Sequence, residues 1–200
     1  MKSSSLIDFA FLALAAGSLL TNSEAKAASI TSRITENDGQ AVIELSGEIV
    51  EGDSQKIASW IKYWNEKDVR VSGIRLNSRG GGVFEAEKIA SMIRGANMAS
   101  VIGKHHVCYS ACVLIFAYGT EKWANTSSEI GVHSVSLNGK ETLESDGITT
   151  AFVRDLKSVG APDSVIVKTI TTPPDQIAYL TADEVRSMGG RVLGPQRINF

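Results

Sequence analysis

The sequence predicts an α/β fold, in which helices pack on the faces of a mostly parallel sheet. After residue 40 the hydrophobic periodicity alternates between two residues and about 3.6 residues, as it does where strands alternate with helices. The elements between residues 41 and 103 follow in the order βαβαβ, and strands joined in this way usually run parallel. With 200 residues, 43% hydrophobic and 21% charged, the chain can bury a core without disulfides or metals.

The first half of this pattern consists of three strands and two helices. The expected elements are a strand at 41–50 with a turn at Gly47, a helix at 53–68, a strand at 71–77, a helix at 83–96 and a short strand at 99–103. In the first helix Ile57, Ile61 and Trp64 fall on one face behind an Asp-Ser start, which suits an N-terminal cap. The segment 78–82, Ser-Arg-Gly-Gly-Gly, separates the second strand from the second helix.

The second half begins with an apolar run at 111–118 that has no polar face, so as a helix it must be buried nearly all round. The further expected elements are strands at 122–124 and 130–133, a polar loop at 137–147, helices at 148–160 and 162–170, a capped helix at 181–190 and a last strand at 191–194. No internal repeat and no long linker divides the chain. We therefore expect a single domain over residues 28–200.

Residues 1–27 have the features of a secretory signal peptide. Lys2 precedes an apolar stretch at 9–20, and Ala25-Lys26-Ala27 has the small-x-small form of a cleavage site. The alternative is an uncleaved anchor, but a bilayer span needs roughly 20 apolar residues. We expect cleavage after Ala27 and a periplasmic or secreted protein. A net charge of −2 leaves no basic surplus, so nucleic acid is not an expected partner.

A candidate nucleophile lies where the chain enters the apolar helix. Ser110 precedes that helix, whose positive end favours nearby negative charge, although serine often only caps a helix. The glycines of 78–82 offer backbone N–H groups without obstructing side chains, as an oxyanion requires. Their alternatives are a simple tight turn or a phosphate-binding loop, and the second lacks the usual GxGxxG or Lys-Ser/Thr pattern.

A serine nucleophile also needs a base, and the sequence has three histidines. His105 and His106 lie in a loop just before the serine. His133 ends a short apolar strand and is better placed to face an active site. His105 and His106 with Cys108 could suggest a metal, but no second cluster has zinc-like spacing, so no metal and no cofactor are expected.

Five segments in a fixed order resemble the proteolytic subunit of the Clp protease and its exported relatives, within the wider Clp/crotonase fold. The segments are LSGEI (45–49), LNSRGGGVFEA (76–86), CYSACVLIFAYGTEKWA (108–124), SSEIGVHS (127–134) and YLTADEVRSMGGRV (179–192). Their gaps are also similar to those of the family. The resemblance covers residues 41–194 and implies a Clp/crotonase-like spiral of βαβ units.

The resemblance implies a serine peptidase of the Ser-His-Asp type that cleaves peptides through an acyl-enzyme. Ser110 would be the nucleophile and His133 the general base. The N–H groups of Ala111 and of Gly80 or Gly81 would hold the oxyanion. The acid of the family lies two residues before the YLTA segment, where this chain has Ile177.

The carboxylate nearest to that position is Asp175. It could serve as the third member after a small loop adjustment, or it could be a turn residue behind Pro174. A Ser-His dyad and a loss of activity are the other readings that Ile177 leaves open.

Cys108 and Cys112 flank the serine and are the only cysteines. If one lies just outside the helix and the other inside it, their Cα atoms fall within the roughly 4.4–6.8 Å that a disulfide needs. Such a bridge would fix the nucleophile turn. The alternative is a pair of buried free thiols that pack as small apolar residues.

The leading hypothesis is thus an exported peptidase that acts on peptides or proteins. The resemblance also implies a homo-oligomer, and no ATP-driven partner is expected outside the cytoplasm. Rival readings are an acyl-thioester crotonase, a Ser-Lys peptidase using Lys104 or Lys168, and an inactive relative that binds or scaffolds. The crotonase would need coenzyme A, which export makes hard to supply.

Overall fold

The protein is described here by a computed structural model, which covers residues 27–35, 38–137 and 139–194. The predicted signal peptide, apart from Ala27, lies outside these residues. The described part is built around a six-stranded sheet in the order β1-β2-β3-β4-β6-β9. The strands are β1 (Ser29–Ile34), β2 (Ala41–Ser46), β3 (Val71–Asn77), β4 (Ala99–Ile102), β6 (Lys122–Asn125) and β9 (Gly190–Leu193). Only β1 runs antiparallel to its neighbour, so the predicted mostly parallel sheet is confirmed.

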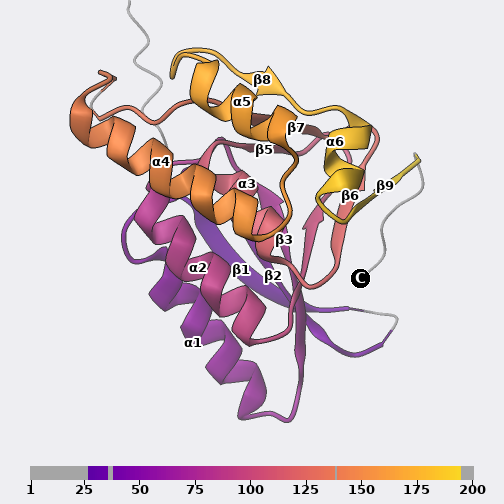
Figure 1. The fold of residues 1–200 in the computed structure, drawn as a ribbon. Helices are drawn as coiled ribbons and strands as arrows, with labels where there is room; N and C mark the ends of the chain where they lie inside the picture. The colour runs from indigo at the N-terminus through magenta and orange to yellow at the C-terminus, as the bar shows by residue number, and fades with distance from the viewer. Residues whose placement is uncertain (1–26, 36–37, 138, 195–200) are drawn as a thin grey trace, which may run out of the picture.

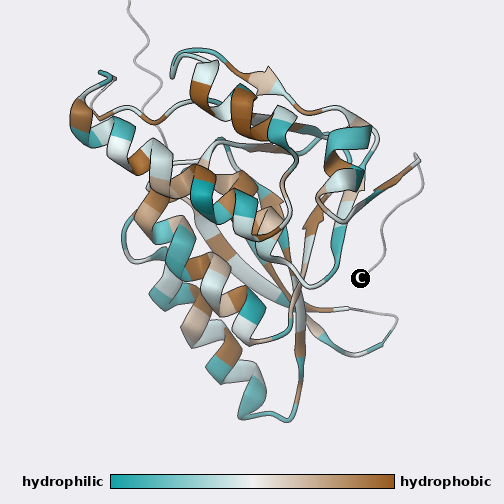
Figure 2. Ribbon diagram, viewed as in Figure 1, coloured by the Kyte–Doolittle hydropathy of each residue, from teal (hydrophilic) through white to brown (hydrophobic). Residues whose placement is uncertain are grey.

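Helices cover the main sheet and each other (Figure 1). They are α1 (Asp53–Asn65), α2 (Val83–Gly95), α3 (Ala111–Tyr118), α4 (Leu143–Ser158), α5 (Asp163–Thr171) and α6 (Ala182–Ser187). α1 packs on β1, β2, β3 and α2, while α3 lies between α2 and β4. Hydrophobic and hydrophilic residues alternate around α1 and α2, as helices with one buried face require (Figure 2).

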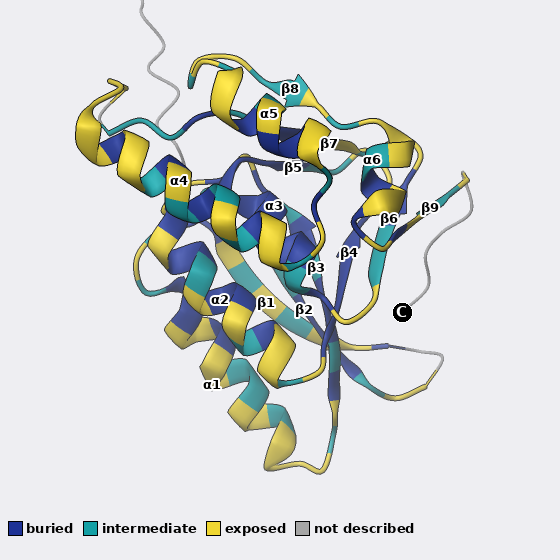
Figure 3. Cartoon of the chain, viewed as in Figure 1, coloured by how far each residue is buried: buried dark blue, intermediate teal, exposed yellow. Residues whose placement is uncertain are grey.

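The third helix is the centre of the core. Every residue from Ala111 to Ala117 is fully buried, and β4 beside it is buried along its whole length. Figure 3 shows α3 buried beside α2 and α4, whose outer faces carry exposed residues. The predicted all-round burial of the apolar run is therefore confirmed, and the residue that precedes it is held against a rigid support.

A second sheet carries the chain around the start of α3. It has three strands in the order β5-β7-β8, namely β5 (Val107–Tyr109), β7 (Glu129–Val132) and β8 (Ala178–Tyr179). β5 and β7 are parallel, and β8 is antiparallel to β7. Because β5 leads straight into Ser110 and β7 into His133, this small sheet brings the two candidate residues to the same end of the molecule.

The structure extends the sequence-based expectations in two places. β1, β5 and β8 were not expected, and each is short or lies at a sheet edge. The polar stretch 137–147 was expected to be a loop, but α4 begins within it at Leu143. A capping box explains the early start, because Thr142 accepts from the Ser145 N–H and the Ser145 hydroxyl accepts from the Thr142 N–H.

Candidate active site

The glycine-rich turn after β3 is joined to the strand that leads into Ser110. The Ser78 N–H donates to the Val107 oxygen at 2.8 Å, and the Tyr109 N–H donates to the Ser78 oxygen at 3.0 Å. These two hydrogen bonds form an isolated β-bridge between Ser78, the residue after β3, and Cys108 of β5. They place Gly80 and Gly81 beside Ser110, although some thirty residues separate them in the sequence.

Ser110 has an unusual backbone conformation. Its φ of 54° and ψ of −128° lie in a region that residues other than glycine rarely adopt. Its N–H donates to the Gly131 oxygen at 2.9 Å, and its side chain makes no capping hydrogen bond to α3. The reading of Ser110 as a simple helix cap therefore has no support in the structure, and its hydroxyl is available for other interactions.

Steric crowding explains the first two glycines of the turn. A Cβ on Gly80 would lie 2.7 Å from the Cβ of Ser110 and 2.8 Å from the Tyr109 oxygen. A Cβ on Gly81 would lie 2.8 Å from the Ile49 nitrogen and closer still to the Ile49 oxygen. Both glycines also have positive φ, 103° and 135°. Only glycine fits at either position, because a side chain would displace the backbone around Ser110 at Gly80 and the backbone of Ile49 at Gly81.

Near Ser110, backbone N–H groups on both sides of the serine have no acceptor among the described residues. Among them are the N–H groups of Gly81 and of Ala111, the first residue of α3. The Gly80 N–H, in contrast, donates to the Ser78 hydroxyl at 3.1 Å. Of the two glycines predicted as alternatives for the oxyanion hole, Gly81 is therefore the one whose donor is free.

Ser110 and His133 line the same cavity, which has a volume of about 440 Å³. Apolar side chains form much of its wall, and the charged side chains of Glu48 and Arg79 also reach it. The other lining residues are Gly81, Gly82, Val83, Phe84, Val135, Ser136, Leu137 and Ile148. This size and mixture are typical of sites that bind small molecules or single peptide side chains.

His133 is half-buried, and its orientation is set by a backbone carbonyl. Its Nδ1 lies 2.6 Å from the Ser134 oxygen. Because a carbonyl oxygen only accepts hydrogen bonds, this contact assigns the donor role to Nδ1, and in the neutral ring Nε2 is then the acceptor. Ser134 is fixed in turn, because its N–H donates to the Thr172 oxygen and its hydroxyl donates to Glu141 at 2.7 Å. Ser110 and His133 line the same cavity but are not hydrogen-bonded to each other.

Asp175 is placed differently from the other candidates. It is exposed in a turn between α5 and β8, and it makes no hydrogen bond or ion pair with any described residue. Ile177, which stands where the family resemblance expects an acid, packs directly on the backbone of Gly131. The structure thus brings together Ser110, His133, Gly81 and Ala111, but not Asp175.

Cys108 and Cys112 form a disulfide with a Cα–Cα distance of 5.2 Å, within the predicted range. The first lies in β5 and the second in the first turn of α3, and both are fully buried. Of the two open readings, the bridge is therefore the one that the structure shows. It closes a loop with Ser110 at its centre.

Two contacts around the site were not predicted from the sequence. Tyr109 donates a hydrogen bond to Glu129, and its ring meets that of Tyr179 edge-on at 6.0 Å. Burial and the Glu129 carboxylate together raise the pKa of Tyr109 above its ordinary value. The contact anchors β5 to β7 one residue before the serine. The sequence shows the polar groups of Tyr109 and Glu129. Their contact depends on the pairing of β5 with β7, which was not predicted.

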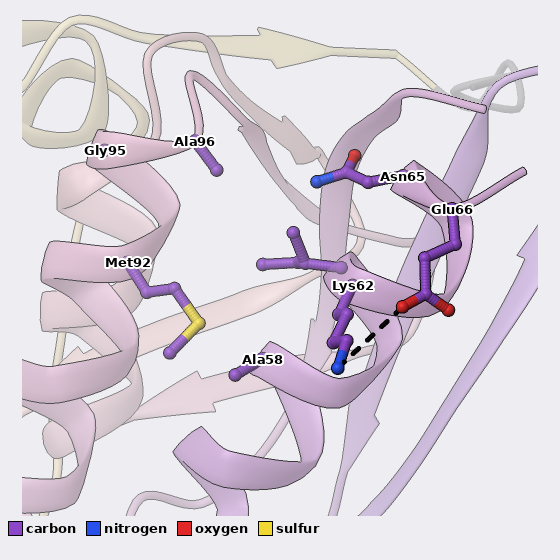
Figure 4. Close-up of a pocket in the computed structure, with 8 residues that line it drawn as sticks. Ala58, Lys62, Asn65, Glu66, Met92, Gly95 and Ala96 are labelled. Carbon is purple, nitrogen blue, oxygen red and sulfur yellow. Dashed lines mark ion pairs between the residues drawn. The ribbon is translucent and has the colours of Figure 1, made fainter. Parts of the chain in front are cut away.

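The other groove and the two candidate lysines lie away from the cavity that Ser110 and His133 line. A groove of about 740 Å³ lies between α1 and α2 and is lined by Ile61, Met92 and their neighbours (Figure 4). The Lys168 ammonium pairs with Glu184 at 2.6 Å, and neither it nor Lys104 lines the Ser110 cavity. Within the described ranges no cluster of three or more potential metal-ligating side chains occurs. No helix among them is long and apolar enough to cross a membrane.

Comparisons with known proteins agree with the fold. A scan against protein-family models finds no match, and a search of curated proteins finds none either. Among solved structures, ClpP1 from Listeria monocytogenes is 16% identical with a TM-score of 0.60, and the match covers 78% of this chain and 92% of that one. A variant of the 1510-N membrane-bound stomatin-specific protease is 19% identical with a TM-score of 0.58, covering 78% and 79%. The chain therefore has the Clp protease-like fold that the order of its motifs predicts.

Proposed function

We propose that the protein is an exported serine peptidase, with Ser110 as nucleophile and His133 as general base. The observation that carries this proposal is the shared cavity, in which a serine and a histidine lie beside two unused backbone donors. The burial of α3 keeps this arrangement rigid, which catalysis by preorganised groups requires. The disulfide supports export, because such bridges persist in oxidising compartments.

In this mechanism the Ser110 oxygen attacks the scissile carbonyl, and His133 Nε2 takes the hydroxyl proton. The negative charge that develops on the carbonyl oxygen is held by the N–H groups of Gly81 and Ala111. His133 then gives its proton to the leaving amine, and an acyl ester remains on Ser110. A water molecule, deprotonated by the same histidine, releases the second product.

The role usually given to an acid in a triad is to hold the histidine in the correct tautomer. Here the Ser134 carbonyl lies against Nδ1 and can do so, and Ser134 is itself fixed by Thr172 and Glu141. We therefore favour a Ser-His dyad oriented by the backbone. Asp175, exposed and unpaired with His133, is the competing third member.

The substrate proposed is a peptide or unfolded protein segment that places an apolar side chain in the cavity. A homo-oligomer is also proposed. It is supported by the exposed apolar side chains of Val167, Ile170 and Tyr179, which lie on α5 and β8 and are each more than half exposed. No ATP-driven partner is proposed for an exported protein.

A second candidate function is binding without catalysis. Ile177 favours it, since this side chain occupies the position where the family resemblance expects the acid and cannot orient His133. In that case the cavity would hold a peptide without cleaving it.

The test is labelling of residues 28–200 with a fluorophosphonate probe, which mimics the acyl-transfer transition state. We expect the adduct on Ser110 by peptide mapping and none in Ser110→Ala. His133→Ala should label at least about a hundredfold more slowly, because a general base contributes roughly 10²–10⁴-fold. A folded protein that forms no adduct would favour the binding function instead.

Asp175→Asn separates the dyad from the triad in the same assay. A backbone-oriented histidine predicts a labelling rate within about twofold of the unsubstituted protein. A fall near the roughly 10⁴-fold loss seen when a triad aspartate becomes asparagine would assign Asp175 as the third member.

A further inference from the structure

The disulfide encloses the candidate nucleophile in a short loop. Cys108 and Cys112 stand two residues on either side of Ser110, in different elements. The bridge therefore joins the end of β5 to the start of α3 across the turn that presents the serine. Both cysteines are fully buried, so the bridge lies beneath the turn rather than on the surface.

The conformation of Ser110 requires such a constraint. A residue with a side chain at φ 54° and ψ −128° stays there only where its surroundings over-determine it. Two contacts constrain it from outside, the hydrogen bond to the Gly131 oxygen and the close approach of Gly80. The disulfide is the constraint that acts from within the turn itself.

The elements that carry the two cysteines do not depend on the bridge for their packing. Cys108 is paired with Ile130 in the ladder between β5 and β7, and its backbone also pairs with that of Ser78. Cys112 belongs to a helix buried all round by apolar contacts. A disulfide that closes so short a loop also restricts the unfolded chain much less than a long-range bridge would. Its main effect is therefore local.

We propose that the Cys108–Cys112 disulfide is a positioning element for Ser110, which holds the nucleophile in its reactive conformation and makes activity depend on the bridge being oxidised. This inference rests on the proposed peptidase function. Breaking the bridge lets the turn relax toward a less strained conformation while the core persists. The serine oxygen then moves relative to His133 and to the donors of Gly81 and Ala111.

The test compares the unsubstituted protein, residues 28–200, with the double variant Cys108→Ala/Cys112→Ala. Labelling by the fluorophosphonate probe and the kcat and KM for a fluorogenic peptide are measured on folded protein. We expect kcat and the labelling rate to fall at least about tenfold, since a misplacement of about 1 Å can cost about 10²-fold. KM should change less than about twofold, because substrate contacts lie in the cavity wall.

Ile57→Val is the matched control. Ile57 is a fully buried residue of α1, away from the turn, and its substitution also removes buried volume. It should leave the labelling rate of the folded protein unchanged. The unsubstituted protein provides a second comparison when it is reduced by a water-soluble phosphine, which takes oxygen from water as the disulfide gains two hydrogens. Reoxidation should restore the lost activity.

The outcomes are separable. If the oxidised, unsubstituted protein is not labelled, the proposed peptidase function fails and the positioning role fails with it; if that protein is labelled, the double variant tests the positioning role by itself. If the folded double variant labels as fast as the unsubstituted protein, the positioning role is wrong. Unfolding of both the double variant and the reduced protein would also overturn it, because the bridge would then stabilise the whole fold.

Discussion

At the scale of single residues, the three consecutive glycines of the 78–82 turn have different reasons to be there. Gly81 has a φ of 135° and would bring a Cβ against the backbone of Ile49. Gly82, the residue before α2, has a φ of −63°, and a Cβ there would lie 3.7 Å from its nearest neighbour. Steric fit therefore requires glycine at the first of these positions and not at the second.

Gly81→Ala should destabilise the protein by roughly 2–6 kcal/mol, as the sum of overpacking and a strained backbone. Gly82→Ala, the matched control, should change the free energy of unfolding by less than about 1 kcal/mol. Urea denaturation followed by circular dichroism measures both values. Equal stability of the two variants would contradict the close contact between Gly81 and Ile49.

Residue chemistry also explains how much of the site could be predicted from the sequence. Ser110, Ala111 and the glycines stand in a recognisable pattern, and the structure places Ser110, Gly81 and His133 at one cavity. The Ser134 carbonyl against His133 could not be predicted, because every residue has a carbonyl and only the folded chain selects one. The choice between Gly80 and Gly81 could not be predicted either, because it depends on the Ser78 hydroxyl, which accepts the Gly80 N–H.

At the scale of elements, one buried carboxylate joins the first two helices. Glu85, in the first turn of α2, is almost fully buried. It accepts the Ser54 N–H at 2.7 Å and pairs with Lys88 at 3.0 Å. Burial alone would raise the pKa of Glu85. The hydrogen bonds from Ser54 and the charge of Lys88 lower it by more than burial raises it, so the pKa falls from an ordinary 4.5 to about 2.

Because the folded pKa is below the unfolded one, Glu85 stabilises the protein fully above pH 4.5 and loses this effect as the pH falls toward 2. Glu85→Gln should cost roughly 1.5–3 kcal/mol near neutral pH, the usual size for hydrogen bonds to a charged group. The difference between the two proteins should shrink below pH 4.5.

Thermal or urea unfolding across this pH range tests the prediction. Glu121→Gln, a substitution of an exposed side chain, serves as the control. A difference between Glu85→Gln and the unsubstituted protein that stays constant with pH would mean that the carboxylate does not act through its charge.

The elements themselves were predictable where their patterns are long. The strand at 71–77 and the helix at 111–118 have the expected bounds, because buried residues recur along the whole strand and the helix is buried from Ala111 to Ala117. β5 and β8, with three and two residues, are too short to show a period. The start of α4 depends on two hydroxyl side chains that cap it, in a stretch whose composition is typical of a loop.

At the scale of the whole molecule, the order βαβαβ determines most of the architecture. Parallel strands need crossover connections, and helices supply these here, which leads to the sheet order β2-β3-β4 with α1 and α2 on its face. After β4 the chain leaves this sheet, and β5 pairs with β7 in the second sheet. No pattern in the sequence predicts this change. The active-site candidates lie where the two sheets meet, so the position of the site depends on the least predictable part of the topology.

The disulfide and the predicted signal peptide make one joint prediction about the molecule as made in a cell. The full chain, produced in a bacterium with a periplasm, should lose residues 1–27 and be recovered with its N-terminus at Ala28. Its mass should be lower by the two thiol hydrogens, because the bridge forms in an oxidising compartment. The same chain begun at residue 28 should stay in the cytoplasm with both thiols reduced. Intact-mass analysis distinguishes the forms, and retention of residues 1–27 in the recovered protein would contradict cleavage after Ala27.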